Sequence, residues 1–200
     1  MFTGLVAGVA AVVSVTPRGA EIDLEVDLGD LSGGDPIGGS IALSGVCCTV
    51  THREGTRHRF TLSPETLRRT WFSRVQVGEL LNIEKPMRTG DLFGGHFVQG
   101  HVDGVAEVEG GVDPHAGGEL WVRLPETLSR YCAVKGSIAL DGVSLTIAAL
   151  EQNRIMVAVI PHTAQLTTIG RRSPGDPLHV EVDVLAKYVE RLLDSRREQA

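Results

Sequence analysis

The sequence predicts an all-β protein in which one small barrel fold occurs twice in tandem and is followed by a C-terminal amphipathic helix. Three observations support this expectation. The chain repeats itself at a constant spacing, each repeat is rich in short strand-like runs separated by glycine turns, and only the last segment has helical periodicity. Blocks that recur in order along a chain indicate one structural unit built twice.

The repeat is visible in four pairs of blocks. By residue range they are 3–12 with 98–108, 39–50 with 136–147, 63–70 with 160–167, and 78–85 with 175–182. The last three pairs share an offset of 97 residues, while Gly4 and Gly100 are 96 apart, a slip that one insertion or deletion explains. The sequence therefore predicts three parts, namely barrels at 1–87 and 88–183 and a helix at 184–200.

Each repeat is expected to consist of β-strands. The run EIDLEV at 21–26 alternates apolar and charged residues, as a half-buried strand does. Asp141-Gly142 is a typical two-residue hairpin turn, and short helical turns are expected after Pro64 and Pro125. Because no long helical pattern lies inside either repeat, closure of the strands into a barrel is the expected way to remove exposed edges.

The apolar run LVAGVAAVVSV at 5–15 resembles the core of a signal peptide, but its features favour a strand. The first basic residue, Arg18, comes after the run, and the run is too short to span a bilayer. Its second copy lies in mid-chain. Three cysteines without CxxC spacing favour free thiols in a reducing compartment. We therefore expect a soluble cytoplasmic protein without a membrane partner.

Charge and composition exclude one class of partner. The net charge of −6 and the aromatic content of 4% argue against nucleic acid, which would need a basic stripe and stacking platforms. Glycines that lead into a helix are also absent from the sequence pattern, which disfavours a dinucleotide or P-loop site.

The C-terminal segment has a stripe of apolar residues at helical spacing. The stripe contains Val184, Leu185, Tyr188, Val189, Leu192 and Leu193. Asp183 precedes it as an expected N-cap. A stripe outside the repeat must be buried somewhere, either against its own barrel or against another subunit, and the sequence leaves both alternatives open.

Matched polar residues in the two repeats indicate a pair of ligand sites. Thr49 and Thr146 match, and so do other hydroxyl side chains, although Ser and Thr are also ordinary strand and turn residues. Cys47 stands where the second repeat has Ser144, and no base flanks it. A polar ligand contact or a packing role is therefore favoured over covalent catalysis for this cysteine.

The stretch GHFVQGHVDG at 95–104 contains two histidines. His96 and His101 are five residues apart, which on a regular strand places them on opposite faces and disfavours a joint metal site. An imidazole beside Asp103 would suit proton transfer. Aligned with the start of the chain, the stretch is expected to form the first strand of the second barrel.

Seven motifs, in order, resemble the riboflavin synthase alpha-chain family of lumazine-binding barrel proteins. They are MFTGLV, SGVCCTVT, SPETLRRT, GGHFVQGHVDG, KGSIALDGVSLTI, IPHT and EVDVLAKYVERLL, and they span nearly the whole chain. The resemblance implies two six-stranded Greek-key barrels and a homotrimer assembled through the C-terminal helix. Each barrel would bind one 6,7-dimethyl-8-ribityllumazine, with active sites between subunits. Association with lumazine synthase is a further implied partnership.

The resemblance also implies a transferase reaction that uses no metal and no organic cofactor. Two molecules of 6,7-dimethyl-8-ribityllumazine undergo dismutation by transfer of a four-carbon unit, which gives riboflavin and 5-amino-6-ribitylaminouracil. This is the last step of riboflavin biosynthesis. A reaction between two identical molecules suits a duplicated domain, because two apposed sites supply proximity and orientation.

Roles for individual residues follow from the same resemblance. Positions linked to catalysis are Phe2, Cys47, His101, Ser144 and Asp183. Substrate contacts assigned to the first barrel are Gly4, Leu5, Val6, Ser40, Cys47, Cys48, Thr49, Thr61, Leu62, Ser63, Pro64, Glu65 and Thr66. Those assigned to the second barrel are Gly100, His101, Val102, Ser144, Leu145, Thr146, Ala158, Val159, Ile160, Pro161, His162 and Thr163. Lys135 is expected to reach the ligand of a neighbouring subunit.

The chain departs from the family pattern at a few places, and two other functions compete with the enzyme. Ser44 stands where the family often has Asn, Cys48 where Leu is usual, and Trp71-Phe72-Ser73 where TNLG is expected. A non-catalytic lumazine- or flavin-binding protein, of the antenna or carrier type, would lose the signature of the second half, which this chain retains. A scaffold for protein partners would leave the matched hydroxyls unexplained.

Overall fold

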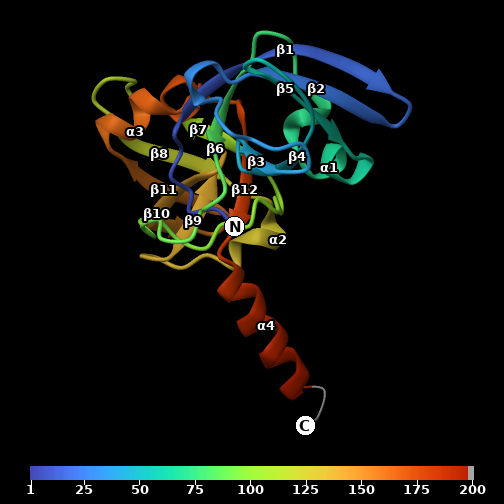
Figure 1. The fold of residues 1–200 in the computed structure, drawn as a ribbon. Coiled ribbons are helices and arrows are strands. Elements are labelled where there is room, and N and C mark those ends of the chain that lie inside the picture. The colour runs from blue at the N-terminus through green and yellow to red at the C-terminus, as the bar shows by residue number, and fades with distance from the viewer. Residues whose placement is uncertain (198–200) are drawn as a thin grey trace.

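The computed structural model describes residues 1–197 and contains two closed six-stranded barrels, from which one helix extends (Figure 1). The first barrel consists of β1 (Gly8–Arg18), β2 (Glu21–Asp27), β3 (Ser40–Leu43), β4 (Val46–Glu54), β5 (Arg57–Leu62) and β6 (Leu80–Glu84). The second consists of β7 (Gly104–Gly110), β8 (Gly118–Arg123), β9 (Ser137–Leu140), β10 (Val143–Glu151), β11 (Arg154–Val159) and β12 (Pro177–Val182). The prediction of a duplicated six-stranded barrel is confirmed.

The two barrels share one topology. The strands follow the order β1-β2-β5-β4-β3-β6 in the first and β10-β11-β8-β7-β12-β9 in the second, which is the same circular order. All neighbouring strands pair antiparallel, and the β2–β5 and β8–β11 neighbours skip two strands in the chain, as in a Greek key. Alternation places Leu24 and Val26 of β2 fully inside, and each barrel has its own apolar core.

Short helices begin at Pro64 and directly after Pro125, as expected, and four further short helices lie elsewhere in the chain. The short helices are α1 (Pro64–Arg69), α2 (Glu126–Ser129), α3 (Pro161–Leu166), and the 3₁₀ helices η1 (Gly29–Leu31), η2 (Trp71–Arg74) and η3 (Thr168–Arg171). The long helix is α4 (Val184–Arg197). The predicted N-cap of α4 is confirmed, because an Asp183 carboxylate oxygen accepts the Leu185 N–H at 3.0 Å. The last residues of the expected helix, 198–200, lie outside the described part of the chain.

The two barrels meet at the tips of two equivalent hairpins. Ser44-Gly45 and Asp141-Gly142 have φ of 42°, 81°, 43° and 78°, so both pairs form turns with two left-handed central residues, as predicted for Asp141-Gly142. A Cβ on Gly45 would lie 2.6 Å from the Gly142 nitrogen, and the reverse distance is the same. Only glycine permits this approach.

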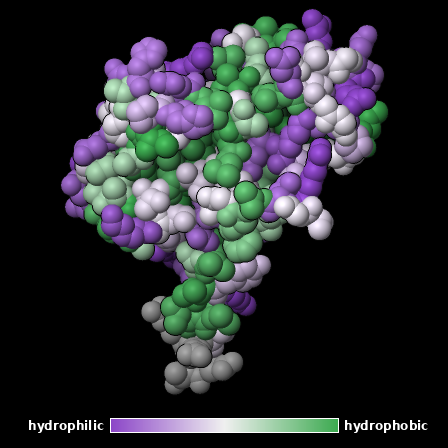
Figure 2. Space-filling view, turned by 60° about the vertical axis from the view of Figure 1, so that its left-hand side comes forward, coloured by the Kyte–Doolittle hydropathy of each residue, from purple (hydrophilic) through white to green (hydrophobic). Residues whose placement is uncertain are grey.

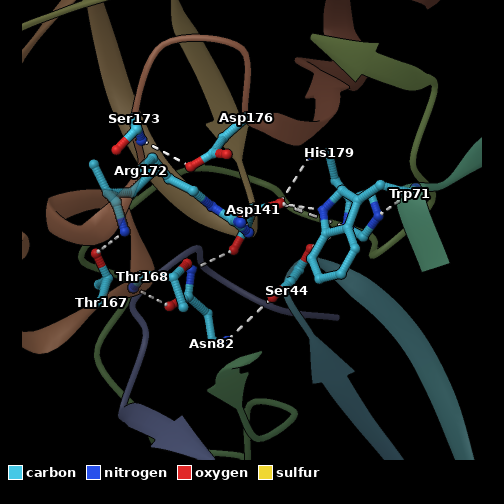
Figure 3. Close-up of polar contacts among 11 residues, drawn as sticks. Ser44, Trp71, Asn82, Asp141, Thr167, Thr168, Arg172, Ser173, Asp176 and His179 are labelled. Carbon is cyan, nitrogen blue, oxygen red and sulfur yellow. Dashed lines mark hydrogen bonds and ion pairs between the residues drawn. The ribbon is translucent and has the colours of Figure 1, made fainter. Parts of the chain in front are cut away.

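Asn82 of β6 crosses the interface beside these turns (Figure 3). Its side-chain Nδ2 donates to the Asp141 carbonyl at 2.9 Å, and its Oδ1 accepts the Thr168 N–H at 2.7 Å. Asn82 is 1% exposed, so both of its polar atoms are satisfied without water.

His179 of β12 holds the equivalent position in the second barrel. It bonds to the first half of the chain, just as Asn82 bonds to the second half. Its Nδ1 lies 2.8 Å from the Ser44 carbonyl, and its Nε2 accepts the Trp71 N–H at 3.0 Å. A ring nitrogen that faces a carbonyl must carry the proton, and one that accepts an N–H must not. The contacts therefore select the neutral tautomer with hydrogen on Nδ1.

The unusual Trp71 strengthens this contact on one side only. Its ring stacks on His179 with centroids 4.8 Å apart and an interplanar angle of 12°. Its Nε1 donates to Asp141 Oδ1 at 3.0 Å, while Arg172 pairs with Asp141 Oδ2 at 2.6 Å. The second side has Asn82 and Thr168 at the matching positions. The departure at Trp71 therefore reshapes the interface between the barrels.

The chain segments before β1 and β7 are not strands. We call residues 1–7 and 95–103 the crossing segments. The prediction that 95–104 forms the first strand of the second barrel is wrong, because β7 begins at Gly104. Gly4 and Gly100 have φ of 77° and 81°, which turns the chain out of the extended conformation and toward the opposite barrel.

Helix α4 projects away from both barrels (Figure 1). Its apolar residues are exposed, at 57% for Leu185, 64% for Tyr188 and 65% for Leu192, and green side chains cover much of its visible side in Figure 2. The structure therefore does not bury the stripe on its own barrel. Within residues 1–197, none of the helices has the length and apolar character needed to cross a membrane.

The buried His179 predicts a specific pH dependence of stability. Burial lowers the pKa of His179 to about 4, against the opposing charge of Asp141, whereas the unfolded chain titrates near its usual value of about 6.5. The unfolded state therefore binds more protons between these values. The contribution of His179 to the free energy of unfolding is therefore highest above about pH 6.5. It falls by about 3 kcal/mol as the pH decreases toward 4.

We expect His179→Asn to flatten this profile, because asparagine makes the same two bonds at position 82 and does not titrate. Urea unfolding at pH 7 and pH 4.5 measures the difference. The exposed His52→Asn serves as the control and should retain the wild-type slope. A wild-type slope in His179→Asn would show that this histidine is not the source.

Candidate functional site

The two crossing segments pair with each other between the barrels. The Phe2 N–H donates to the Val98 carbonyl at 2.8 Å, and the Val98 N–H returns a bond at 3.2 Å. Phe2 is fully buried, in a cluster with Val98, Ala42 and Ala139. The Phe2 side chain thus belongs to the core between the barrels, where it places the adjacent residues of the first crossing segment.

Each crossing segment leads into the first strand of one barrel and docks on the other barrel. The Gly4 carbonyl accepts the Ser144 N–H at 2.8 Å, and the Gly100 carbonyl accepts the Cys47 N–H at 2.9 Å. Val6 packs against the core of the second barrel, and Val102 packs against that of the first. The grouping expected from the sequence is therefore exchanged, because Gly4–Val6 lie beside Ser144 and Gly100–Val102 lie beside Cys47.

Strand alternation divides the predicted residues into outward and inward sets. Thr49 and Thr146 point out of their barrels and are exposed. Cys47 lies on the same outer face of β4 as Thr49, and Ser144 lies on the same outer face of β10 as Thr146. Cys48 lies between them with its side chain in the core, where burial raises the pKa of its thiol. A ligand contact at Cys48 would have to come from the backbone. Leu62, Leu145 and Val159 also have buried side chains.

The structure joins His96 to Ser144. His96 Nδ1 lies 2.7 Å from Ser144 Oγ, and the His96 N–H donates to the Thr3 carbonyl at 3.1 Å. Its Nε2 is buried and has no hydrogen-bond partner among the described residues. Burial lowers the pKa of His96, and the nearby charge of Asp183 opposes this. A neutral imidazole bonded to a hydroxyl can take up or return a proton.

The remaining predicted residues lie on exposed positions or near the ends of β5, β11 and β12. His101 is exposed, Asp183 caps α4, and Lys135 is exposed with φ of 72°. Residues 61–66 and 158–163 occupy equivalent places, at the end of β5 and start of α1 and at the end of β11 and start of α3. Glu65 is engaged by Arg68 and Arg69 of its own helix.

Ser40 lies beside a cavity in the first barrel. Ser40 pairs with Thr49 across β3 and β4. The cavity has a volume of about 220 Å³ and is lined by residues that include Asp35, Ser40, Lys85 and Arg88. Within residues 1–197, no group of three or more His, Cys, Asp or Glu side chains is arranged to hold a metal ion.

Three residues of this region were missed by reasoning from the sequence. The sequence pattern relates His96 to His101 and Asp103, and nothing in its spacing connects it to Ser144, 48 residues away. Glu84 and Glu181 also contact the crossing segments. A signal for both existed, because they occupy matching positions in the 78–85 and 175–182 blocks.

Comparison with known proteins adds independent information. The Lumazine binding domain model matches the chain twice, at residues 3–86 and 99–183. The riboflavin synthase of Photobacterium phosphoreum is 41% identical over 197 residues, which cover 96% of this chain and 89% of that protein. The riboflavin synthases of Brucella abortus (strain 2308) and Escherichia coli (strain K12) are 38% and 34% identical, over 96% and 98% of this chain and 98% and 95% of theirs.

Solved structures show the same fold. A crystal structure of LumP complexed with riboflavin has a TM-score of 0.85 and 21% identity, and covers 91% of this chain and 99% of that chain. LumP complexed with 6,7-dimethyl-8-(1'-D-ribityl) lumazine has a TM-score of 0.83, 20% identity and the same coverage.

Proposed function

The chain belongs to the riboflavin synthase family of lumazine-binding domain proteins, and we propose that it converts two molecules of 6,7-dimethyl-8-ribityllumazine into riboflavin and 5-amino-6-ribitylaminouracil. The reaction moves a four-carbon unit from one lumazine to the other. Donor and acceptor are chemically identical, so no external oxidant or reductant is needed.

The observation that carries this proposal is the pair of equivalent docking sites. Each barrel presents a polar residue, Cys47 or Ser144, whose backbone N–H binds the carbonyl of a glycine from a crossing segment. Two similar sites on one chain match a reaction between two similar molecules. Holding both molecules in a fixed orientation can supply much of the rate enhancement, since effective molarities reach about 10⁵–10⁸ M.

The two sites differ in their chemistry. Ser144 has the buried His96 at 2.7 Å, while no histidine contacts the Cys47 thiol in hydrogen-bonding geometry within residues 1–197. We infer that the Ser144–His96 pair moves protons to and from the lumazine held by the second barrel. The Cys47 site supplies binding and orientation for the other molecule.

A carrier of lumazine or flavin is the second candidate, because the LumP structures share the fold. Their identity of 20–21% supports the fold alone, whereas riboflavin synthases reach 32–41% over nearly the whole chain. The enzyme is therefore the better supported of the two functions.

Assembly belongs to the same proposal. The exposed apolar stripe of α4 would be buried between subunits of a homotrimer, with each active site formed at a subunit boundary. The free cysteines of the protein fit a cytoplasmic location. Association with lumazine synthase stays a prediction.

Turnover is the direct test. Purified protein incubated with 6,7-dimethyl-8-ribityllumazine alone should produce riboflavin absorbance, with one riboflavin formed for every two lumazines consumed. Tight binding without turnover would instead identify a carrier. Absence of both binding and turnover would exclude both functions.

The Ser144–His96 pair can be tested by a double-mutant cycle. Ser144→Ala and His96→Asn should each lower kcat on the order of 10²-fold, as for loss of acid–base help, and the double variant should lose little more. Cys47→Ser is the matched control, because it introduces the hydroxyl of the second barrel without a histidine. Losses that multiply in the double variant would contradict a joint role.

Deletion of residues 186–200 should convert the assembly to monomers in light scattering. Because the deletion also removes Lys187, which pairs with Asp103, Leu192→Glu is a milder variant that charges only the stripe. Arg191→Ala, on an exposed polar position, is the control. Trimers that persist in both variants would show that α4 does not assemble the protein.

A further inference from the structure

Two buried carboxylates contact the crossing segments from the ends of β6 and β12. Glu84 ends β6 and is 7% exposed, and Glu181 lies in β12 and is 3% exposed. They are 97 residues apart, at matching positions of the repeat. A buried carboxylate is costly to desolvate, and an apolar side chain would usually serve a barrel core better. Its occurrence at both equivalent positions therefore needs a reason.

Backbone N–H groups of the crossing segments, together with one hydroxyl, satisfy these carboxylates. Glu84 accepts the Thr3 N–H at 2.7 Å and the Gly4 N–H at 3.0 Å, together with the Thr3 hydroxyl at 2.8 Å. Such charge-assisted bonds are about twice as strong as neutral ones.

Glu181 repeats the arrangement on the second crossing segment. It accepts the N–H groups of Gln99, Gly100 and His101 at 2.7, 2.9 and 3.1 Å. Burial raises the pKa of both carboxyls, and these hydrogen bonds act in the opposite direction.

The residues held by each carboxylate contact the opposite barrel. Gly4 is bound to Glu84 of the first barrel through its N–H and to Ser144 of the second through its carbonyl. Gly100 is bound in the same way to Glu181 of the second barrel and Cys47 of the first. The docking is tight, since a Cβ on Gly4 would lie 2.5 Å from the Ser144 Cβ.

We propose that Glu84 and Glu181 are positioning residues, each of which fixes a crossing segment so that this segment completes the ligand site of the opposite barrel. Glu84 thereby serves the Ser144 site, and Glu181 serves the Cys47 site. This inference rests on the proposed function, because it assigns the two sites to the two lumazines. A substitution of the carboxylate in one barrel should therefore change the affinity for the ligand bound at the other barrel.

The carboxylates can be removed with little change of shape. Glu84→Gln and Glu181→Gln keep the side-chain volume but place an N–H₂ donor against backbone donors, so one contact of each set becomes repulsive. We expect kcat of the folded variants to fall on the order of 10²-fold, since displacement by about 1 Å has that effect. Glu84→Asp and Glu181→Asp, which keep the charge, should recover part of the loss.

A double-mutant cycle on riboflavin affinity, followed by flavin fluorescence, tests which site each carboxylate serves. Glu84→Gln is combined with Ser144→Ala and, as the matched control, with Cys47→Ala, and Glu181→Gln is combined with the same two variants. We expect the affinity change of the Glu84→Gln, Ser144→Ala double variant to differ at least about five-fold from the product of the two single changes. For Glu84→Gln combined with Cys47→Ala, the change should equal that product. Glu181→Gln should show the reverse.

Several outcomes would overturn the proposal. Coupling within the same barrel, or simple multiplication in all four combinations, would show that the carboxylates do not position the opposite site. A lower Tm with unchanged kcat per folded molecule would show a purely structural role. If the Gln variants do not fold, Thr3→Val and Glu181→Asp provide milder changes for the same cycle. Wild-type turnover separates these results from failure of the proposed function itself.

Discussion

The contact between the two hairpin tips constrains the rest of the molecule. Gly45 and Gly142 approach so closely that any side chain at either position would collide with the backbone of the other. This contact fixes the two barrels in one relative position, and Asn82 and His179 then span the junction with matched pairs of hydrogen bonds. Because the polar groups are buried, each alternative placement would leave donors and acceptors unsatisfied.

The fixed junction determines where the crossing segments run. Phe2 and Val98 fill the space between the barrels and pair through their backbones, which sends Gly4 and Gly100 in opposite directions. Each glycine then meets the first residues of a strand in the opposite barrel. The candidate sites are therefore products of the pairing of barrels, and neither barrel would contain its complete site alone.

Departures from the internal symmetry are as informative as the symmetry. His179 and Trp71 stand where the other half has Asn82 and Thr168, and they stack in the interface without disturbing its hydrogen-bond pattern. His96 gives the Ser144 site an imidazole, whereas among the described residues no histidine bonds to the Cys47 thiol. The duplicated scaffold thus presents two similar candidate sites, one of which has an imidazole beside its hydroxyl.

The sequence by itself determined the duplicated barrel, the hairpin turn at Asp141-Gly142, the cap at Asp183 and the family, because these features depend on local pattern and on motifs that lie close together in the chain. Only the tertiary structure decided which segment serves which barrel, that His96 meets Ser144, and that Glu84 and Glu181 hold backbone of the crossing segments. Such contacts join residues 48 to 140 positions apart. Their formation depends on how two barrels pack, and periodicity along one strand carries no information about that packing.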